Sequence, residues 1–221
     1  MSRSLFDQNL EQGGKGAWHF ETLLQDQGLW PAAGVDEVGR GCLAGPVVAA
    51  AVILPEDISS HGITDSKKLT PTQRQRLAKL IHSVAISVSI ARVEPSRIDE
   101  INILQASLEA MKLAVKGLSL KPKALLVDGN QQIPMPLPQK VITKGDSRSC
   151  SIAAASIVAK VYRDKIMAEY SEEFPAYRFD KHKGYATKEH KTLLQKFGPC
   201  AIHRKSFKGV IQDALHIDTQ K

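Results

Sequence analysis

Four acidic residues, Asp36, Glu37, Asp128 and Asp146, lie where strands of the chain are expected to end. Ligands of open α/β sheets gather at the ends of strands. Carboxylates brought together there repel one another and lose hydration unless a cation lies among them. Oxygen ligands without nearby cysteine or histidine suit Mg²⁺ or Mn²⁺ better than Zn²⁺. The four acids therefore predict a divalent metal site that activates water for hydrolysis.

The acids also have an ordinary interpretation, and one pair poses a geometric problem. Each acid taken singly is explained as a solvated strand-end residue or a turn cap, and Asp128 before a glycine is a common turn signal. Neighbours on a regular strand point to opposite faces, so Asp36 and Glu37 cannot both face one ion from ideal geometry. We expect a distorted strand, a Glu37 side chain that reaches round its edge, or a mixture of the two.

Glycine and basic residues follow the first acidic pair. In Gly39-Arg40-Gly41 the flanking glycines let the backbone lie directly against a ligand, although an ordinary turn between strands explains them equally well. The sequence contains neither G-x-x-x-x-G-K-[ST] nor G-x-G-x-x-G, so sites for nucleoside triphosphates and dinucleotides are unsupported.

Two further pairs of polar residues precede expected helices. They are Ser66 with Lys67, and Ser147 with Arg148. Hydroxyl and cationic groups in such places bind phosphate. As isolated features, both pairs are also explained as simple helix caps.

The C-terminal region is strongly basic from Lys181 onward and contains Tyr185 between two small residues. A basic run is by default a solvated face, but beside an acidic metal centre it predicts a track for nucleic acid. Tyr185 is suited to stacking on a sugar or base, or to packing in the core. No Ser-His-Asp order or His-x-x-x-His pattern stands out, so we predict structural or surface roles for His182, His190 and His203.

Alternating strands and helices must position these side chains. Runs of small and β-branched residues predict strands at 34–38, 47–54 and 124–127, and a period-two alternation predicts another at 84–90. Helical spacing predicts helices at 20–30, from 70 onward, at 98–115, 152–170 and 187–197. The helix from 70 opens with Thr-Pro-Thr-Gln, a capping box with proline at its first position. The order indicates an α/β sheet domain with a helical C-terminal extension.

Bulk composition narrows the class of protein. The 30 Lys and Arg against 23 Asp and Glu give a formal net charge of +7, which favours a polyanionic partner. The three cysteines are widely spaced, with no C-x-x-C pair, and this indicates a reducing cytoplasm rather than a disulfide framework. We expect no membrane span, because the longest apolar run is far too short, and no signal peptide.

The motifs as a set resemble bacterial ribonuclease HII, of the type 2 ribonuclease H family. They are GVDEVGRGCLAGPVVAAAVILP, TDSKKLT, LLVDGN, KGDSRSCSIAAASIVAKVYRD, HKGYATKEH and GPCAIHRKSF, and they run from Gly34 to Phe207 in the family's order. The resemblance implies an RNase H-like α/β fold with a mixed central sheet flanked by helices and a helical C-terminal extension. It also implies an endoribonuclease that hydrolyses the RNA strand of RNA/DNA hybrids.

The resemblance further implies cleavage on the 5′ side of single ribonucleotides embedded in duplex DNA, as in ribonucleotide excision repair. The products carry 3′-hydroxyl and 5′-phosphate ends, and two Mg²⁺ or Mn²⁺ ions act together. The positions that match the family's metal-binding and catalytic carboxylates are Asp36, Glu37, Asp128 and Asp146. Gly39, Arg40 and Gly41 match the motif that contacts the ribose 2′-hydroxyl, and Tyr185 matches the tyrosine that stacks on the neighbouring deoxyribose.

We expect residues 1–31 to form an N-terminal tail with a short helix and residues 32–221 to form the catalytic domain. Within it, the helical part from about 171 to 221 is expected to bind substrate, and the protein to act as a monomer. One rival interpretation is a nucleic-acid-binding protein without catalysis, whose acids only cap turns. Another is ribonuclease HIII, a family with a much longer N-terminal domain than the 33 residues that precede Gly34 here.

Overall fold

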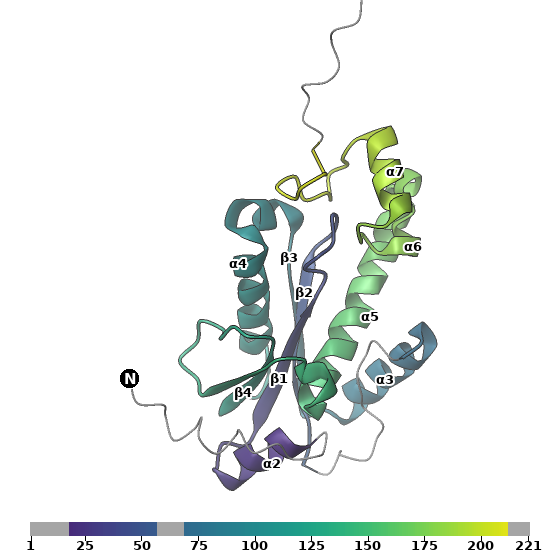
Figure 1. Cartoon of the computed structure of the whole chain (residues 1–221). Coiled ribbons are helices and arrows are strands. Elements are labelled where there is room, and N and C mark those ends of the chain that lie inside the picture. Colours follow the sequence, from purple (N-terminus) through teal and green to yellow (C-terminus); the bar gives the residue numbers. More distant parts are fainter. Residues whose placement is uncertain (1–17, 57–68, 212–221) are drawn as a thin grey trace, which may run out of the picture.

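A mixed β-sheet forms the centre of the molecule (Figure 1). The computed structural model describes residues 18–56 and 69–211. Within these ranges the sheet has five strands in the order β3-β2-β1-β4-β5. Their bounds are β1 Ala32–Val38, β2 Val47–Ile53, β3 Ser87–Val93, β4 Ala124–Asp128 and β5 Gln139–Ile142. The predicted mixed sheet with flanking helices is thereby confirmed.

The register of the sheet aligns the ends of its two central parallel strands. β1 pairs antiparallel with β2 and parallel with β4, and β4 pairs parallel with β5. Val35 lies opposite Val127. The next residues along the two strands are Asp36 and Asp128, so the register places these acids side by side at one edge of the sheet.

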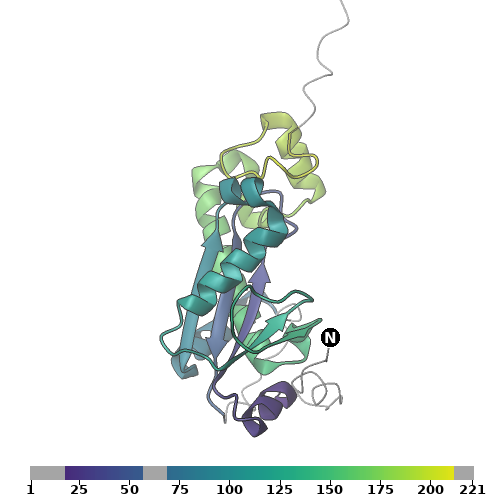
Figure 2. The same ribbon diagram turned by 90° about the vertical axis from the view of Figure 1, so that its left-hand side faces the viewer.

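Helices cover both faces of the sheet. Helix α4 (Pro95–Lys116) packs on one face, and α5 (Cys150–Glu173) with α3 (Pro71–Val84) packs on the other (Figures 1 and 2). Strand β2 is buried along its whole length and contributes alternate residues to the two sides. Val47 and Ala49 join the core under α4, whereas Val48 and Ala50 join the core under α5. The alanines and glycines along this interface let α5 lie close to the sheet; a Cβ on Gly34 would overlap the α5 backbone at Ser151.

Helix α2 (His19–Asp26) is attached to the start of α5 by a buried acid. The Oε1 atom of Glu21 accepts hydrogen bonds from the Ser149 hydroxyl at 2.6 Å and from the Ser151 amide at 2.9 Å. A carboxylate in this position interacts favourably with the helix dipole. Burial raises the pKa of Glu21 despite these bonds. No local sequence pattern predicts this contact, because its partners lie about 130 residues apart in the chain.

The C-terminal part of the chain is helical, as predicted, and lies at one end of the sheet (Figure 1). It contains the 3-10 turn η4 (Pro175–Tyr177), α6 (Phe179–His182) and α7 (Lys188–Phe197). The first turn of α7 is capped by the Thr187 side chain. In the described parts of the chain, no helix is both long and apolar enough to cross a bilayer.

Helix α2 ends at Asp26, before the predicted residue 30, and strand β5 was not predicted. Two further differences concern the start of β3 and an interruption of α4. Helix α3 continues to Val84, and β3 begins at Ser87, so the strand predicted at 84–90 starts three residues too early. The capping box at Thr70 and Gln73 is present as predicted. Helix α4 is interrupted at Asn102, whose φ of 66° is left-handed and whose Oδ1 caps the amides of the turn that follows. The regular apolar spacing across this position gave no indication of the interruption.

Candidate active site

A cavity of about 390 Å³ opens where β1 and β4 end. It lies between the sheet edge, α3, α5 and the segment after α6. Its lining residues are Asp36, Glu37, Val38, Gly39, Arg74, Asp128, Ser156, Lys160 and Tyr185. Three of the four predicted acids therefore line one hollow, together with a glycine of the Gly-Arg-Gly triplet and the predicted stacking tyrosine.

Asp36 is the most enclosed of these acids. It is 5% exposed, it faces α5, and it forms a hydrogen bond with the Ser156 side chain of that helix. Its Oδ1 atom also accepts the Glu37 amide at 2.7 Å. Burial raises the pKa of Asp36 well above its usual range, and the neighbouring charges of Glu37 and Asp128 raise it further. The site thus has an excess of negative charge in a poorly solvated place.

Glu37 points from the opposite side of β1 and still lines the same cavity. Its Oε1 atom lies 3.1 Å from the Arg40 guanidinium, which is about half exposed. Burial raises the pKa of Glu37, and Arg40 opposes that shift. Neighbouring residues of a strand point to opposite faces, yet Asp36 and Glu37 both line this cavity, because it lies at the end of the strand.

Asp128 is tied to the loop that carries Asp146. The amide of Gly145 donates to Asp128 Oδ1 at 2.6 Å. Asp146 follows in the 3-10 turn η3 (Gly145–Ser147), where it is 3% exposed, but it is not among the residues that line the cavity. Within residues 18–56 and 69–211, no three Asp, Glu, His or Cys side chains already converge closely enough to hold a metal ion.

The donor set nevertheless fits a hard divalent cation. The acids of the cavity offer oxygen atoms alone, which Mg²⁺ and Mn²⁺ prefer. Burial is the main cause of the raised pKa values of Asp36 and Glu37, and the charge of Asp128 adds to both; a bound cation would favour the charged form of these carboxylates. Asp36, Glu37 and Asp128, which line the cavity, are the residues that would hold such an ion. Asp146 follows Gly145, whose amide is hydrogen-bonded to Asp128.

Arg163, a buried arginine of α5 that no sequence motif singled out, holds the turn between β1 and β2. Arg163 of α5 is fully buried and donates three hydrogen bonds to backbone carbonyls. Its acceptors are Pro46 at 3.0 Å, Ala44 at 3.1 Å and Lys183 at 2.9 Å. The guanidinium therefore joins the turn to the segment that carries Tyr185.

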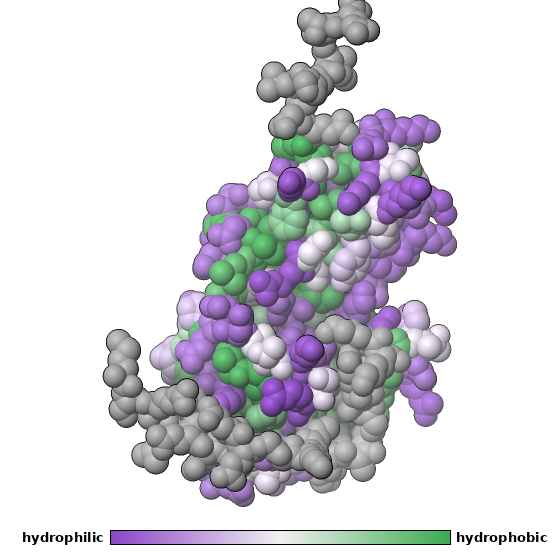
Figure 3. Space-filling view, viewed as in Figure 1, coloured by the Kyte–Doolittle hydropathy of each residue, from purple (hydrophilic) through white to green (hydrophobic). Residues whose placement is uncertain are grey.

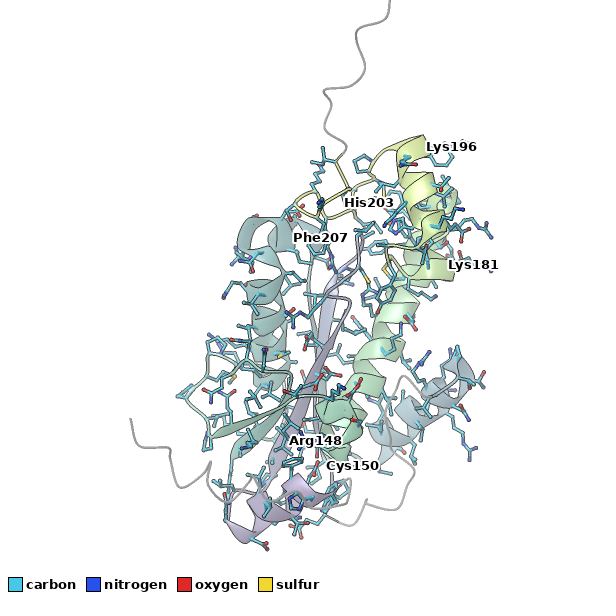
Figure 4. The ribbon with its side chains drawn as sticks, in the orientation of Figure 1. Arg148, Cys150, Lys181, Lys196, His203 and Phe207 are labelled. Atoms are coloured by element: carbon cyan, nitrogen blue, oxygen red, sulfur yellow. The ribbon has the colours of Figure 1, made fainter. Side chains whose placement is uncertain are left out.

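A second buried arginine reaches the same turn from the C-terminal loop. Arg204 donates to the Gly45 carbonyl at 3.0 Å and to the Arg40 carbonyl at 2.8 Å. Desolvation lowers the pKa of Arg204 to about 10, and its guanidinium lies 5.1 Å from the centre of the Phe207 ring. His203 and Phe207 lie in this region, where the C-terminal loop meets the β1–β2 turn (Figure 4). Arg204 thus holds the Arg40 backbone within the Gly39–Gly41 triplet, and Arg163 holds the later residues of the same turn.

Gly39 must be glycine for two reasons. Its φ of 93° is left-handed, and a Cβ would lie 2.2 Å from the Arg163 Nε atom. Gly41 is different, because a Cβ there would meet nothing within 4 Å. The absence of a side chain at Gly41 leaves open backbone at the surface beside the exposed Arg40.

Tyr185 is 40% exposed at the cavity, so its ring is available to a ligand. Lys160 of α5 lies 5.7 Å from the centre of this ring and 2.7 Å from Asp164. Lys160 and Arg74 also line the cavity, and no sequence motif singled out either residue as a site residue. Lys160 follows Ser156 by one helical turn, a spacing that places the two side chains on one face of α5.

Two further predicted site residues, Ser147 and Arg148, are not among the residues that line the cavity. Ser147 and Arg148 are exposed at the start of α5, where Arg148 lies over the Phe20 ring at 5.3 Å (Figure 4). The cap of α5 is Ser149, which accepts the Ile152 amide. Ser66 and Lys67 lie outside the described residues.

The family model and the proteins most similar in sequence agree on one family. The model of the family described as Ribonuclease HII matches residues 33–210. A ribonuclease HII of Geotalea uraniireducens is 54% identical over 191 residues, which cover 86% of this chain and 88% of that protein.

Solved structures of similar proteins share the fold. The ribonuclease H2 of Pyrococcus horikoshii superposes with a TM-score of 0.69 at 27% identity, covering 81% of this chain and 94% of that one. The PCNA:RNase HII complex from Archaeoglobus fulgidus gives a TM-score of 0.69 at 28% identity, covering 83% and 98%. The mixed sheet with its helical C-terminal part is thus the architecture of these ribonucleases.

Proposed function

Because this chain belongs to the ribonuclease HII family, we propose that its cavity cuts DNA on the 5′ side of an embedded ribonucleotide. The chain is a ribonuclease H hydrolase with the RNase H-like fold, an endoribonuclease of RNA/DNA hybrids that depends on divalent metal. Cleavage at a single ribonucleotide, leaving 3′-hydroxyl and 5′-phosphate ends, is the finer activity that we propose.

One observation carries the proposal. Asp36, Glu37 and Asp128 share a cavity with Gly39 and Tyr185. The first three are the chemical centre and the last two are suited to recognising sugars on either side of a junction between RNA and DNA. A protein that only bound nucleic acid would have no use for three carboxylates that repel both one another and the phosphate backbone.

We propose that Asp36, Glu37, Asp128 and Asp146 hold two Mg²⁺ or Mn²⁺ ions. When bound, such a pair supplies Lewis acidity on both sides of the scissile phosphate, at the attacking water and at the leaving 3′-oxygen. The carboxylates orient this centre, and the buried position of Asp36 limits access of bulk water. The 2′-hydroxyl is then a group to be recognised and takes no part as nucleophile.

The backbone of Gly39, Arg40 and Gly41 is proposed to contact the ribose 2′-hydroxyl, the group by which RNA differs from DNA. Tyr185 stacks on the adjacent deoxyribose. Arg40, with one nitrogen on Glu37 and about half of its side chain exposed, adds positive charge near the phosphate.

Further phosphate contacts are proposed at basic and hydroxyl groups. They come from Ser66, Lys67, Ser147 and Arg148, and from Lys160 and Arg74 in the cavity wall. Cationic side chains at such places position the backbone of the nucleic acid without reading its sequence.

We further propose that residues 32–221 form the catalytic domain, with α2 as an appended element and the part from about 171 contributing to substrate binding. The protein is expected to act as a monomer in the cytoplasm. Its substrates are RNA/DNA hybrids and DNA duplexes that contain ribonucleotides.

The decisive experiment incubates the protein with a DNA duplex that carries one ribonucleotide, with divalent metal omitted and then restored. We expect a single cut 5′ to the ribonucleotide, only with metal, and ends that a DNA polymerase extends. An intact duplex in Mg²⁺ and in Mn²⁺ would refute the proposal. Activity on long hybrids alone would instead favour the ribonuclease HIII specificity.

A pair of substitutions separates catalysis from binding. Asp36→Asn and Asp128→Asn remove one charge each and are expected to lower cleavage by about 10² or more while duplex binding persists. Asp36→Asn should also leave metal-free stability equal or higher, because it relieves a crowded buried charge. Full cleavage by either variant would support turn caps in place of metal ligands.

A further inference from the structure

The segment that presents Tyr185 is held by three buried histidines that the proposed reaction does not use. His182, His190 and His203 are 7%, 0% and 1% exposed. The rings of His182 and His190 stack with centres 4.2 Å apart and planes within 13° of parallel. Burial of three imidazoles in one cluster is costly unless their nitrogens are hydrogen-bonded.

The hydrogen bonds of this cluster have one consistent direction. The Cys200 amide donates to His203 Nδ1 at 2.9 Å, so the ring proton of neutral His203 lies on Nε2. His203 Nε2 is 3.1 Å from His190 Nε2, which therefore accepts. His190 then carries its own proton on Nδ1 and donates it to the Tyr185 carbonyl at 2.9 Å. The chain of bonds runs from Cys200 to Tyr185.

The same peptide is fixed from its other side. The Tyr185 amide donates to the His182 carbonyl at 2.9 Å, and the Gly184 amide donates to His182 Nδ1 at 3.3 Å. The Gly184 carbonyl accepts from the Leu43 amide at 2.8 Å, next to the Gly-Arg-Gly turn. Gly184 itself has a left-handed φ of 83° and no room for a Cβ against the Ala44 carbonyl. The tyrosine side chain is exposed, but its backbone is rigidly placed.

We propose that His190, oriented by His203, is a positioning residue that sets Tyr185 against the cavity and so determines how well the enzyme acts at a junction between RNA and DNA. The inference rests on the proposed stacking role of Tyr185. A long RNA/DNA hybrid has no deoxyribose for Tyr185 to stack on in the cleaved strand. Its cleavage should therefore depend less on His190. The histidine chain then acts on substrate choice rather than on the hydrolytic step.

Electrostatics support this arrangement. Burial lowers the pKa values of His182 and His190 and lowers that of His203 to about 4. Neighbouring histidines add to the lowering at His190 and His203. All three rings are therefore neutral at neutral pH. Neutral rings are required, because a second proton on His190 would place two N–H groups face to face across the 3.1 Å contact.

Two substitutions of His190 divide its two hydrogen bonds. In His190→Asn the amide nitrogen lies near the Nδ1 position and keeps the donor to the Tyr185 carbonyl. In His190→Gln the amide lies near the Nε2 position, so it keeps the contact with His203 and loses the donor to Tyr185. The two variants are similar in polarity and differ in the bond that matters.

The test compares kcat and KM on a duplex with one ribonucleotide and on a long RNA/DNA hybrid, with melting temperatures for every variant. We expect His190→Gln to raise KM for the single ribonucleotide by about tenfold with a much smaller change on the hybrid. His190→Asn should stay within about threefold of the parent on both substrates. Loss on both substrates in proportion to melting temperature, equal for Asn and Gln, would overturn the inference and leave a packing role alone.

Two controls complete the design. If His190→Gln does not fold, the His203 variants test the preceding bond of the chain, from His203 Nε2 to His190 Nε2. His203→Gln keeps a donor near the Nε2 position, and His203→Leu removes it.

Tyr185→Ala distinguishes a failure of the proposed stacking role from a failure of the inference about His190. If it leaves junction cleavage intact, the stacking role fails and the inference fails with it. If it impairs junction cleavage while His190→Gln does not, the inference alone fails.

Discussion

At the residue scale, Gly39 and Gly41 of the Gly-Arg-Gly triplet are glycines for different reasons. At Gly39 the chain needs a left-handed φ and space for Arg163, and both are properties of the fold. At Gly41 the chain needs neither, so a glycine there is explained by access to the backbone from outside. The two positions therefore separate structure from recognition within one triplet.

Gly39→Ala is expected to destabilise the protein by about 2–4 kcal/mol, from backbone strain and overlap with Arg163. Thermal unfolding would show this as a melting temperature lower by roughly 5–15 °C for a chain of this size.

Gly41→Ala is the matched control, because its Cβ meets nothing within 4 Å. Its stability should change by less than about 0.5 kcal/mol. Its cleavage at a single ribonucleotide should still fall, because the added methyl group covers the backbone proposed to meet the 2′-hydroxyl. Equal stability losses in the two variants would contradict this account of Gly39.

Residue types and spacing predicted part of the site: they indicated which acids lie close together, but not the buried arginines that support them. Asp36 and Asp128 could be expected together, because Asp36 lies near the end of β1, Asp128 ends β4, and parallel strands bring their C-terminal ends to one edge. Arg163 and Arg204 could not be expected, since an arginine that satisfies backbone carbonyls far along the chain leaves no local pattern. Whether Asp146 joins the acids stays a prediction.

Helix α5, at the scale of elements, sets the distances within the site. Ser156 contacts Asp36, Lys160 lies beside Tyr185, and Arg163 lies under the β1–β2 turn. These positions are four and three residues apart, so they lie along one face of the helix. One rigid element thus places the acids, the Tyr185 ring and the Gly-Arg-Gly turn relative to one another.

Arg163→Met should cost about 3–5 kcal/mol, because three carbonyls lose their donor in a buried place. Arg163→Lys keeps the charge but is expected to recover only part of this loss, since one ammonium cannot reproduce the planar fork. Denaturant unfolding measures both.

Arg178→Met serves as the control for Arg163, because Arg178 is exposed and its ion pair with Glu189 is a surface pair. A change below about 1 kcal/mol is expected there. If Arg163→Met unfolds at the same denaturant concentration as the Arg178 variant, the buried arginine is not a structural anchor.

Elements with strong end signals were predictable, and elements defined by their partners were not. Thr70 and Gln73 form the capping box that the sequence predicts. The boundary between α3 and β3 was wrong because Val84 and Ile86 fit either an amphipathic helix end or a strand. Burial resolves the choice: Ser87 is buried and Ile86 is 46% exposed, the reverse of the predicted alternation.

At the scale of the whole molecule, the histidine cluster links the stability of the C-terminal part to pH. Charged groups face the cluster on one side: Glu189 and Asp180 favour the charged form of His182, while Arg178 opposes it. Cys200 lies beside His203. The net effect of burial still lowers the pKa values of all three rings, so folding favours their neutral forms.

Stability should therefore be complete above the ordinary histidine pKa of 6.5 and decline as pH falls towards about 4, the lowered pKa of His203. In that window the unfolded chain binds more protons than the folded one. Melting temperature measured from pH 7.5 downward tests this. His203→Phe should flatten the decline, and an unchanged slope in that variant would assign the acid sensitivity elsewhere.

The charge of the molecule is unevenly distributed, and this gives a final prediction. Hydrophilic side chains gather over α6 and α7, where Lys181 and Lys196 lie on the outer side (Figures 3 and 4). Lys188 and Lys191 are exposed on α7, directly after the segment of Tyr185. If duplex DNA runs from the cavity along α7, these lysines displace counterions from its phosphates.

Replacing Lys188 and Lys191 with glutamine should then lower the slope of log K against log salt by about 2, measured without divalent metal so that the duplex stays intact. Replacing Lys112 and Lys116 with glutamine is the control. These lysines lie on α4, across the sheet from α5, and their replacement removes the same amount of charge from the molecule. A fall in slope confined to the α7 pair means local phosphate contacts. Equal falls in both variants mean that the net charge of +7 attracts nucleic acid without a defined track.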